Sequence, residues 1–357
     1  MKRPIISLHG TYFGNNYGDI LLIAIFAKWI KDVVPNAIIN LPLADKSKTY
    51  ELPEGTTGIL NLIRSKCLVY CGGGYFGEQP KNKGRWARQN FYRHIIVGII
   101  AFLFRKPYAI IGVEFGPLSI SWFRYLCVFL AKHAKLVVVR NVESKEFLLE
   151  NGVKPVLLSN DAVLSLSENV EVISQKEINY EVLLHFQKMN NSFFENYYNL
   201  TLMIIEVLKS ISPNFRIGFI ADSYECSFED NNYYKLFELL EKERIPFKKY
   251  PYRGYLDMIN RINQSTFVVT SKLHVGITAA ALSIRPLSCW VHPKTPRFHK
   301  QIDNSNYCFP ITEIEEDYKE ILNKYFQQAE KYQLPYNTLR MALINRCELE
   351  KFIKNII

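Results

Sequence analysis

The sequence predicts an α/β fold of two doubly wound domains that face each other across a cleft. Short β-rich runs alternate with helical patterns through most of the 357 residues, which is typical of parallel sheets covered by helices on both faces. A polar stretch at residues 166–179 has no clear apolar period and interrupts the alternation once. Since 48% of the residues are hydrophobic, a chain of this length can bury two separate cores.

The first domain is expected at residues 1–165. Its strands are predicted at residues 5–9, 67–71, 108–113, 136–139 and 156–158. Its helices are predicted at residues 20–33, 88–104, 122–132 and 144–151. Because a helical pattern separates each strand from the next, the domain is expected to be Rossmann-like, with a parallel sheet built from βαβ units.

The second domain is expected at residues 180–313, after a linker at residues 166–179. Its strands are predicted at residues 181–186, 216–221, 247–249, 267–270 and 287–291. Its helices are predicted at residues 194–210, 231–244, 255–261 and 273–282. This domain is therefore also expected to be Rossmann-like, and a helical tail is expected at residues 314–357.

Composition and charge narrow the classes of partner. Lys and Arg exceed Asp and Glu by 44 to 34, and this formal charge of +10 favours phosphorylated metabolites, acidic lipid surfaces or nucleic acid. We expect the excess to be spread along the sequence rather than gathered in a Lys/Arg run, so nucleic acid is the least supported partner. Seven cysteines without a CxxC pair indicate neither a disulfide framework nor a zinc site.

Two segments bear on the location of the protein. The N-terminus reaches His9 and Gly10 before any apolar run of useful length, which predicts a first strand, no signal peptide and a cytoplasmic protein. The most apolar stretch, residues 95–104, is too short to span a bilayer. It is flanked by basic residues, namely Arg88, Arg93, Arg105 and Lys106. It is either a buried helix or a helix in peripheral contact with the anionic inner face of a membrane.

Two glycine-rich loops follow predicted strands of the first domain. Residues 10–19 run from the first strand into a helix, and the residues of interest there are Asn16, Gly18 and Asp19. Such a loop either brings backbone amides close to an anionic ligand, or Asn16 or Asp19 simply caps the helix. Gly72, Gly73 and Gly74 follow another strand, where the backbone either contacts a ligand or makes a tight structural turn.

Two charged residues also follow strands of the first domain. Glu114 lies in the loop 112–117 and could bind a hydroxyl or act as a base. Arg140 follows the strand at 136–139, where a guanidinium either clamps a phosphate or carboxylate or forms a structural ion pair with Glu143 or Asp161.

In the second domain, cationic side chains cluster at the ends of two strands. Ser271, Lys272 and His274 mark the passage from the strand at 267–270 into a helix, and Lys294 follows the next strand. Ser271 could be only the helix N-cap, and a single histidine is often a satisfied core residue. With Arg140 across the cleft, the group would suit a small, multiply charged anion better than a neutral sugar.

The motifs together resemble one family. In sequence order they are N-x-G-D at 16–19, GGG at 72–74, G-x-x-x-G-P at 112–117, R-x-x-x-S at 140–144, L-H at 273–274 and P-K at 293–294. This combination, across roughly residues 8–300, resembles the polysaccharide pyruvyl transferases. The resemblance implies a GT-B-like fold, phosphoenolpyruvate as donor, and a hydroxyl of a saccharide or lipid-linked oligosaccharide as acceptor, in the synthesis of cell-surface polysaccharide.

The resemblance also implies roles for individual residues. His274 would be the catalytic acid and base, and Arg140 and Lys294 would contact the donor together with Ser271, Lys272 and Leu273. The acceptor candidates are the loop residues of the first domain, namely Asn16, Gly18, Asp19, Gly72, Gly73, Gly74 and Glu114. No cofactor or metal is expected, because the reaction scheme requires neither and the chain has no Asp-x-Asp motif.

The sequence departs from the family pattern at three positions. Lys272 stands where the family usually has Arg, and Asn141 and Ala162 replace an Asp and a Pro. Lys keeps the charge of Arg but loses its planar fork, so a weaker or differently oriented donor contact is expected. Two alternatives stay open on the sequence: a GT-B sugar-nucleotide glycosyltransferase, and a non-catalytic glycan-binding subunit with the same fold.

Overall fold

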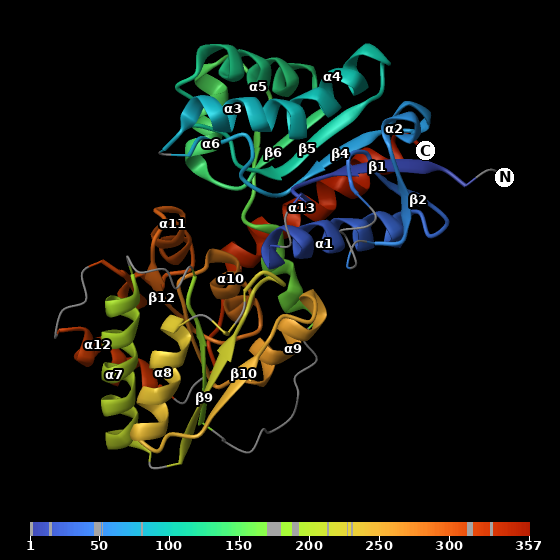
Figure 1. Cartoon of the computed structure of the whole chain (residues 1–357). Helices are drawn as coiled ribbons and strands as arrows, with labels where there is room; N and C mark the ends of the chain where they lie inside the picture. The colour runs from blue at the N-terminus through green and yellow to red at the C-terminus, as the bar shows by residue number, and fades with distance from the viewer. Residues whose placement is uncertain are drawn as a thin grey trace. The chain divides into compact units, whose positions relative to one another are not determined.

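The chain folds into two units. The structure is a computed structural model that describes residues 3–13, 16–45, 51, 53–79, 81–169, 180–187, 193–212, 214–226, 228–229, 231–312, 317–328 and 331–357. The first unit comprises Met1–Val163 and Leu339–Ile357, and the second comprises Leu164–Thr338 (Figure 1). In the part of the chain described, no helix combines the length and the hydropathy needed to cross a membrane.

The first unit is built on a parallel sheet of seven strands. In chain order they are β1 (Ile5–His9), β2 (Ile38–Leu41), β3 (Gly55–Thr57), β4 (Leu68–Cys71), β5 (Tyr108–Val113), β6 (Leu136–Val139) and β7 (Leu157–Leu158). Their spatial order is β3-β2-β1-β4-β5-β6-β7, so the direction of winding reverses between β1 and β4. The central strands are nearly all apolar and fully buried, as expected for a sheet covered on both faces.

Helices cover both faces of this sheet (Figure 1). They are α1 (Tyr17–Val33), α2 (Ile59–Arg64), α3 (Lys83–Asn90), the π-helical turn η2 (Phe91–Ile95), α4 (Ile96–Leu103), α5 (Ser121–His133), α6 (Val142–Glu150) and α13 (Tyr336–Lys354). The helices α3, α4 and α5 lie on one face, and α1 and α13 lie on the other. The core between the sheet and α3–α5 is rich in large buried aromatic side chains, among them Tyr70, Phe76 and Phe123.

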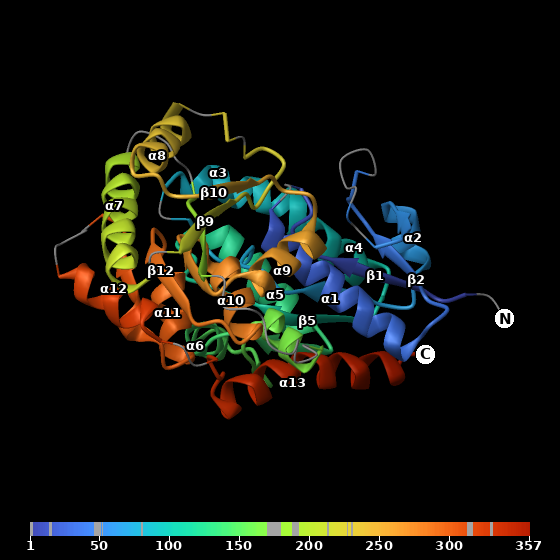
Figure 2. The same ribbon diagram turned by 90° about the horizontal axis from the view of Figure 1, so that it is seen from below.

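The last helix returns to the first unit. The Asn345 side chain on α13 donates to the carbonyl of Asn160 at 2.8 Å and accepts from the Ser159 hydroxyl at 2.9 Å. Arg346 lies 3.4 Å from Asp32 on α1, and both views place α13 beside that helix (Figures 1 and 2). The expectation of a separate helical tail at 314–357 is therefore wrong. The helix α12 (Tyr318–Phe326) belongs to the second unit, and most of α13 belongs to the first.

The second unit has a parallel sheet of six strands. They are β8 (Tyr180–His185), β9 (Phe215–Ile220), β10 (Phe247–Tyr250), β11 (Phe267–Thr270), β12 (Pro286–Trp290) and β13 (Cys308–Pro310). Their spatial order is β10-β9-β8-β11-β12-β13, and winding reverses between β8 and β11. The flanking helices are α7 (Phe194–Ile211), α8 (Asn231–Lys242), α9 (Tyr255–Gln264), α10 (Leu273–Ala281), α11 (Lys294–Gln301) and α12, with the short 3₁₀ turn η4 (Ser305–Tyr307).

The predicted α/β alternation is confirmed in both units, with three strands added. The strands β2, β3 and β13 were not predicted from the sequence, and β3 reads Gly-Thr-Thr, which has no apolar pattern. The 3₁₀ helix η3 (Ala162–Asn169) contains the first residues of the expected linker, and residues 170–179 lie outside those described.

Several histidines are buried within the two units. His9 Nδ1 lies 2.8 Å from the Tyr12 hydroxyl, and His9 Nε2 lies 3.0 Å from His94 Nδ1. Burial lowers the pKa of His9 to about 3 and the pKa of His94 well below its usual value. In the second unit, His299 is bonded to Ser288 and Asn304, and burial lowers its pKa to about 4. These rings are neutral structural groups near pH 7.

Acid should therefore destabilise the fold through these histidines. Between the unfolded-state pKa of about 6.5 and the lower native pKa, only the unfolded chain binds the proton, so stability falls as pH falls. Each such histidine contributes about 1.4 kcal/mol per pH unit to this slope. We expect His299→Gln to reduce the slope of the unfolding free energy between pH 6 and about 4 by that amount. Denaturant titrations at several pH values measure it, and equal slopes for the two proteins would contradict this account.

Candidate active site

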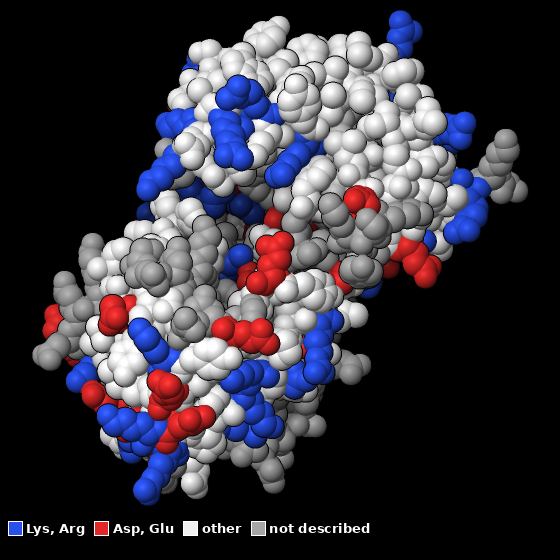
Figure 3. Space-filling model, in the orientation of Figure 1, with Lys and Arg blue, Asp and Glu red and all other residues white. Residues whose placement is uncertain are grey.

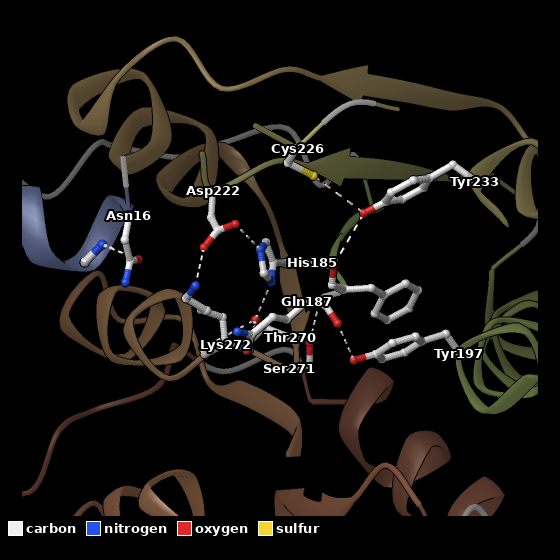
Figure 4. Close-up of polar contacts among 12 residues, drawn as sticks. Asn16, His185, Gln187, Tyr197, Asp222, Cys226, Tyr233, Thr270, Ser271 and Lys272 are labelled. Atoms are coloured by element: carbon white, nitrogen blue, oxygen red, sulfur yellow. Dashed lines mark hydrogen bonds and ion pairs between the residues drawn. The ribbon is translucent and has the colours of Figure 1, made fainter. Parts of the chain in front are cut away.

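The order of strands in the second sheet reverses between β8 and β11, and ligands of doubly wound sheets bind where this happens. The two strands run parallel with His185 directly opposite Thr270, so both strands end at the same level. His185 Nδ1 lies 3.3 Å from Thr270 Oγ1, which links the two strand ends through their side chains (Figure 4).

Asp222, which follows β9, connects these strand ends to a lysine. One of its carboxylate oxygens lies 3.3 Å from His185 Nε2, and the other lies 2.7 Å from Lys272 Nζ (Figure 4). Burial alone would raise the pKa of Asp222, but His185 and Lys272 hold it well below its usual range. Asp222 is therefore a carboxylate that fixes the positions of one imidazole and one ammonium group.

The turn into α10 is stabilised by hydroxyl groups. The backbone N–H of Lys272 donates to Thr270 Oγ1 at 3.0 Å, and the backbone N–H of Gln187 donates to Ser271 Oγ at 2.6 Å. Ser271 thus joins the end of β8 to the end of β11, and it is not the N-cap of α10, because Lys272 occupies that position. Leu273 is the first residue of the helix and is half-buried.

His274 and Lys294 lie on adjacent strand ends, as predicted. His274 is the second residue of α10 and is 9% exposed, and its carbonyl accepts from Thr278 Oγ1 at 2.8 Å. Lys294 is the first residue of α11 and follows β12, which pairs with β11 in parallel. Lys272, His274 and Lys294 therefore all belong to the same edge of one sheet.

In the first unit, the glycine loops also start at the point where strand order reverses. The loop after β1 begins at Gly10, and the triple glycine follows Cys71 on the neighbouring β4. Gly72 and Gly73 have φ values of +46° and +93°, which residues other than glycine rarely adopt. A Cβ atom on Gly72 would come within 2.8 Å of Leu22. The structure therefore explains the first two glycines as a tight turn.

Asn16 caps α1, which is the simpler of the two interpretations of the first loop. Its side-chain oxygen accepts from the amide of Gly18 at 3.4 Å, and its nitrogen donates to the Asp19 carboxylate at 2.9 Å. Gly18 is buried within the first turn of the helix. Residues 14 and 15 of this loop lie outside those described.

Arg140 lies in a buried ion network rather than in an open clamp. Its two terminal nitrogens lie 2.7 Å from Glu114 and 2.9 Å from Asp161, and all three residues are buried. Burial alone would lower the pKa of Arg140, but the two carboxylates raise it above its usual value. The predicted ion pair of Arg140 with Asp161 is confirmed. Its other carboxylate partner is Glu114 rather than Glu143.

Two residues of the site in the second unit were not predicted. His185 and Asp222 each end or directly follow a strand that the sequence analysis did predict. The same rule that selected Lys272 would have selected both, had every polar residue at a strand end been considered. Among the residues described, no three His, Cys, Asp or Glu side chains are grouped so that they could hold a metal ion.

Comparison with known proteins agrees with the predicted family. A sequence model described as polysaccharide pyruvyl transferase matches residues 16–293. The chain belongs to the polysaccharide pyruvyl transferase family. Because members of this family are transferases, this pyruvyl transferase is an enzyme of that class. No curated protein matches it by sequence.

Solved structures show the fold of this pyruvyl transferase. UDP-GlcNAc 2-epimerase from Methanocaldococcus jannaschii is similar with a TM-score of 0.66 at 14% identity, covering 99% of each chain. UDP-GlcNAc 2-epimerase from Neisseria meningitidis, bound to UDP-GlcNAc, is similar with a TM-score of 0.62 at 13% identity, again covering 99% of each chain. The likeness confirms the GT-B-like fold of two Rossmann-like units, and at this identity it shows the fold alone.

The ion network gives the first prediction for the site. Removing Arg140 leaves two buried carboxylates without a counter-charge, so we expect Arg140→Met to lower the unfolding free energy by about 3–5 kcal/mol. Arg124→Met, which alters an exposed arginine of the same unit, should change it by less than about 0.5 kcal/mol. Urea unfolding measures both variants. Wild-type stability in Arg140→Met, combined with loss of affinity for phosphoenolpyruvate, would instead favour the donor clamp.

Proposed function

We propose that this enzyme transfers the pyruvyl group of phosphoenolpyruvate to a saccharide as a ketal, in the synthesis of a cell-surface polysaccharide. The observation that carries the proposal is the group of Lys272, His274 and Lys294 at one edge of the second sheet. Two ammonium groups and the N-terminus of α10 provide charge for the phosphate and carboxylate of the donor. Ser271 and Leu273 belong to the same turn and are assigned to the donor side with them.

Lys272 suits this role despite replacing the arginine usual in the family. Its ammonium group has three N–H bonds, and one of them points to Asp222 at 2.7 Å. The other two can donate hydrogen bonds to oxygens of phosphoenolpyruvate. The lysine side chain is 18% exposed, compared with 8% for Arg140. Asp222 and His185 then act as positioning residues, because they hold the ammonium group at the end of β11.

The proposed chemistry assigns one proton-transfer group. His274, as imidazolium, donates a proton to the methylene carbon of phosphoenolpyruvate, and a sugar oxygen attacks the resulting cationic carbon. Phosphate then leaves with its bridging oxygen, and a second hydroxyl of the sugar closes the ketal. The two hydroxyl protons are released, one to the departing phosphate and one to regenerate the imidazolium. This scheme uses no metal or cofactor.

The saccharide acceptor is assigned to loops of the first unit. Its loops at the ends of β1 and β4 lie where strand order reverses, which is the favoured place for a ligand in such a sheet. Asn16, Asp19 and the triple glycine are the residues of these loops, and their local contacts are those of a cap and a turn. A saccharide, free or lipid-linked, would contact the loop backbone.

The alternative of sugar-nucleotide transfer has weaker support. The match to the pyruvyl transferase model covers residues 16–293 and therefore includes the triple glycine, Lys272 and His274, and it ends one residue before Lys294. The likeness to proteins that bind UDP-sugars shows only that the fold is shared. A non-catalytic role is also disfavoured, because Lys272 keeps a charged, anchored ammonium group at the site.

Substitution of the site separates catalysis from donor binding. We expect His274→Ala to lower turnover by about 10²–10⁴-fold with the fold retained, because the proton-transfer group is lost. Lys294→Ala should mainly raise KM for phosphoenolpyruvate, by about tenfold, through loss of a charge-assisted contact. Phosphate release in the presence of an acceptor glycan measures both, and circular dichroism confirms folding.

The control is Lys300→Ala, which removes an exposed lysine near the other end of α11 and should leave both constants at wild-type values. Full turnover in purified His274→Ala protein would remove this histidine from the mechanism. An unchanged KM in Lys294→Ala would do the same for the donor contact.

A further inference from the structure

The first unit exposes an apolar surface on the helices that cover one face of its sheet. The exposed large side chains on or next to η2, α4 and α5 include Tyr92 (66%), Leu103 (68%), Phe104 (52%), Trp122 (44%) and Tyr125 (69%). We call these five residues the α4–α5 surface. The inner side of the same helices is packed in the core, as Ile95, Val97 and Ala101 show. The segment 95–104 therefore has one side buried in the core and another side exposed.

Ring contacts join the two helices into one continuous surface. Near the start of α5, the ring centroid of Trp122 lies 6.0 Å from that of Phe91 on η2, the turn that leads into α4. Near its end, Phe102 lies 5.0 Å from Phe129 and 4.8 Å from His133, measured between ring centroids. The helices thus lie side by side (Figure 1).

The positive charge of the protein is concentrated around this surface. Residues 79–142 contain 11 of the 44 Lys and Arg but only one of the 34 Asp and Glu, so the remainder of the chain holds 33 of each. The excess is therefore not spread along the sequence as expected, although the segment contains no long Lys/Arg run. The single acid, Glu114, is buried against Arg140. Figure 3 shows blue side chains without red ones over the helices α3 to α5.

The basic side chains are placed to contact a surface beyond the protein. The exposed ones in this segment are Lys81, Lys83, Arg85, Arg88, Arg93, Arg105, Arg124, Lys132 and Lys135, and of these Lys83 is paired with Glu78 at 2.6 Å. Arg105 directly follows the exposed Phe102-Leu103-Phe104, and Arg124 lies between Trp122 and Tyr125. An apolar face bordered by Lys and Arg, with Trp and Tyr among the exposed rings, is the pattern of a helix that lies at a membrane interface.

We propose that the α4–α5 surface binds the surface of an anionic lipid bilayer. Leu103, Phe104 and Trp122 would enter the boundary between headgroups and acyl chains, and the surrounding Arg and Lys would contact lipid phosphates. A second copy of the chain fits less well, because a symmetric contact would bring two equally positive faces together. The proposal does not depend on pyruvyl transfer.

Sedimentation with vesicles tests the proposal on the full chain. We expect binding to vesicles that contain one third phosphatidylglycerol in phosphatidylcholine, no binding to phosphatidylcholine alone, and weaker binding at high salt. Leu103→Asp should reduce the affinity by about tenfold or more, because it places a carboxylate in the apolar face. The matched control is Leu256→Asp on α9 of the second unit, where a leucine is 62% exposed, and it should bind like wild type.

Several outcomes would overturn the proposal. They are absence of binding to the anionic vesicles, equal binding by Leu103→Asp and wild type, and equal binding to neutral and anionic vesicles. Self-association without lipid that Leu103→Asp abolishes, measured by analytical ultracentrifugation, would assign the surface to a second copy instead. Phosphate release with a water-soluble acceptor should be unchanged in Leu103→Asp, so that this test and the test of the reaction fail independently.

Discussion

In a parallel sheet every strand ends at the same edge, and this constraint decides where the polar side chains of both units gather. The central strands β5 and β11 are apolar and buried on both faces, so the charged groups near them lie in the loops that follow. Where strand order reverses, the loops on either side diverge and leave room for a ligand. Both predicted loop clusters begin at such a point, between β1 and β4 and between β8 and β11.

The two units use ionised side chains in different ways. In the first, Arg140 is held between two buried carboxylates, and all three side chains are 8% exposed or less. In the second, Asp222 and Lys272 are 12% and 18% exposed, and a neutral partner, Thr270, completes the group around His185. The first network stabilises the loops that it connects. The second leaves an ammonium group accessible, so we place the donor there.

The sequence predicted strands whose residues are mostly apolar, and β1, β5, β6 and β11 begin and end at the predicted residues. It could not predict β3, because Gly-Thr-Thr has no apolar pattern and pairs only through its backbone. Nor could it choose the partners of Arg140, since Glu114 is 26 residues away and the contact depends on the neighbouring strand ends β5 and β6. The return of α13 to the first unit likewise depends on tertiary contacts, among them those of Asn345.

The central claim is that the edge of the second sheet binds phosphoenolpyruvate through Lys272 and its neighbours. Isothermal titration of the chain with phosphoenolpyruvate, UDP and GDP tests it most directly. The account predicts saturable binding of phosphoenolpyruvate alone, weakened about tenfold or more by Lys272→Met. Lys319→Met, which removes a more exposed lysine that also pairs with a carboxylate, should leave the affinity unchanged. Saturable binding of UDP or GDP without binding of phosphoenolpyruvate would contradict the account.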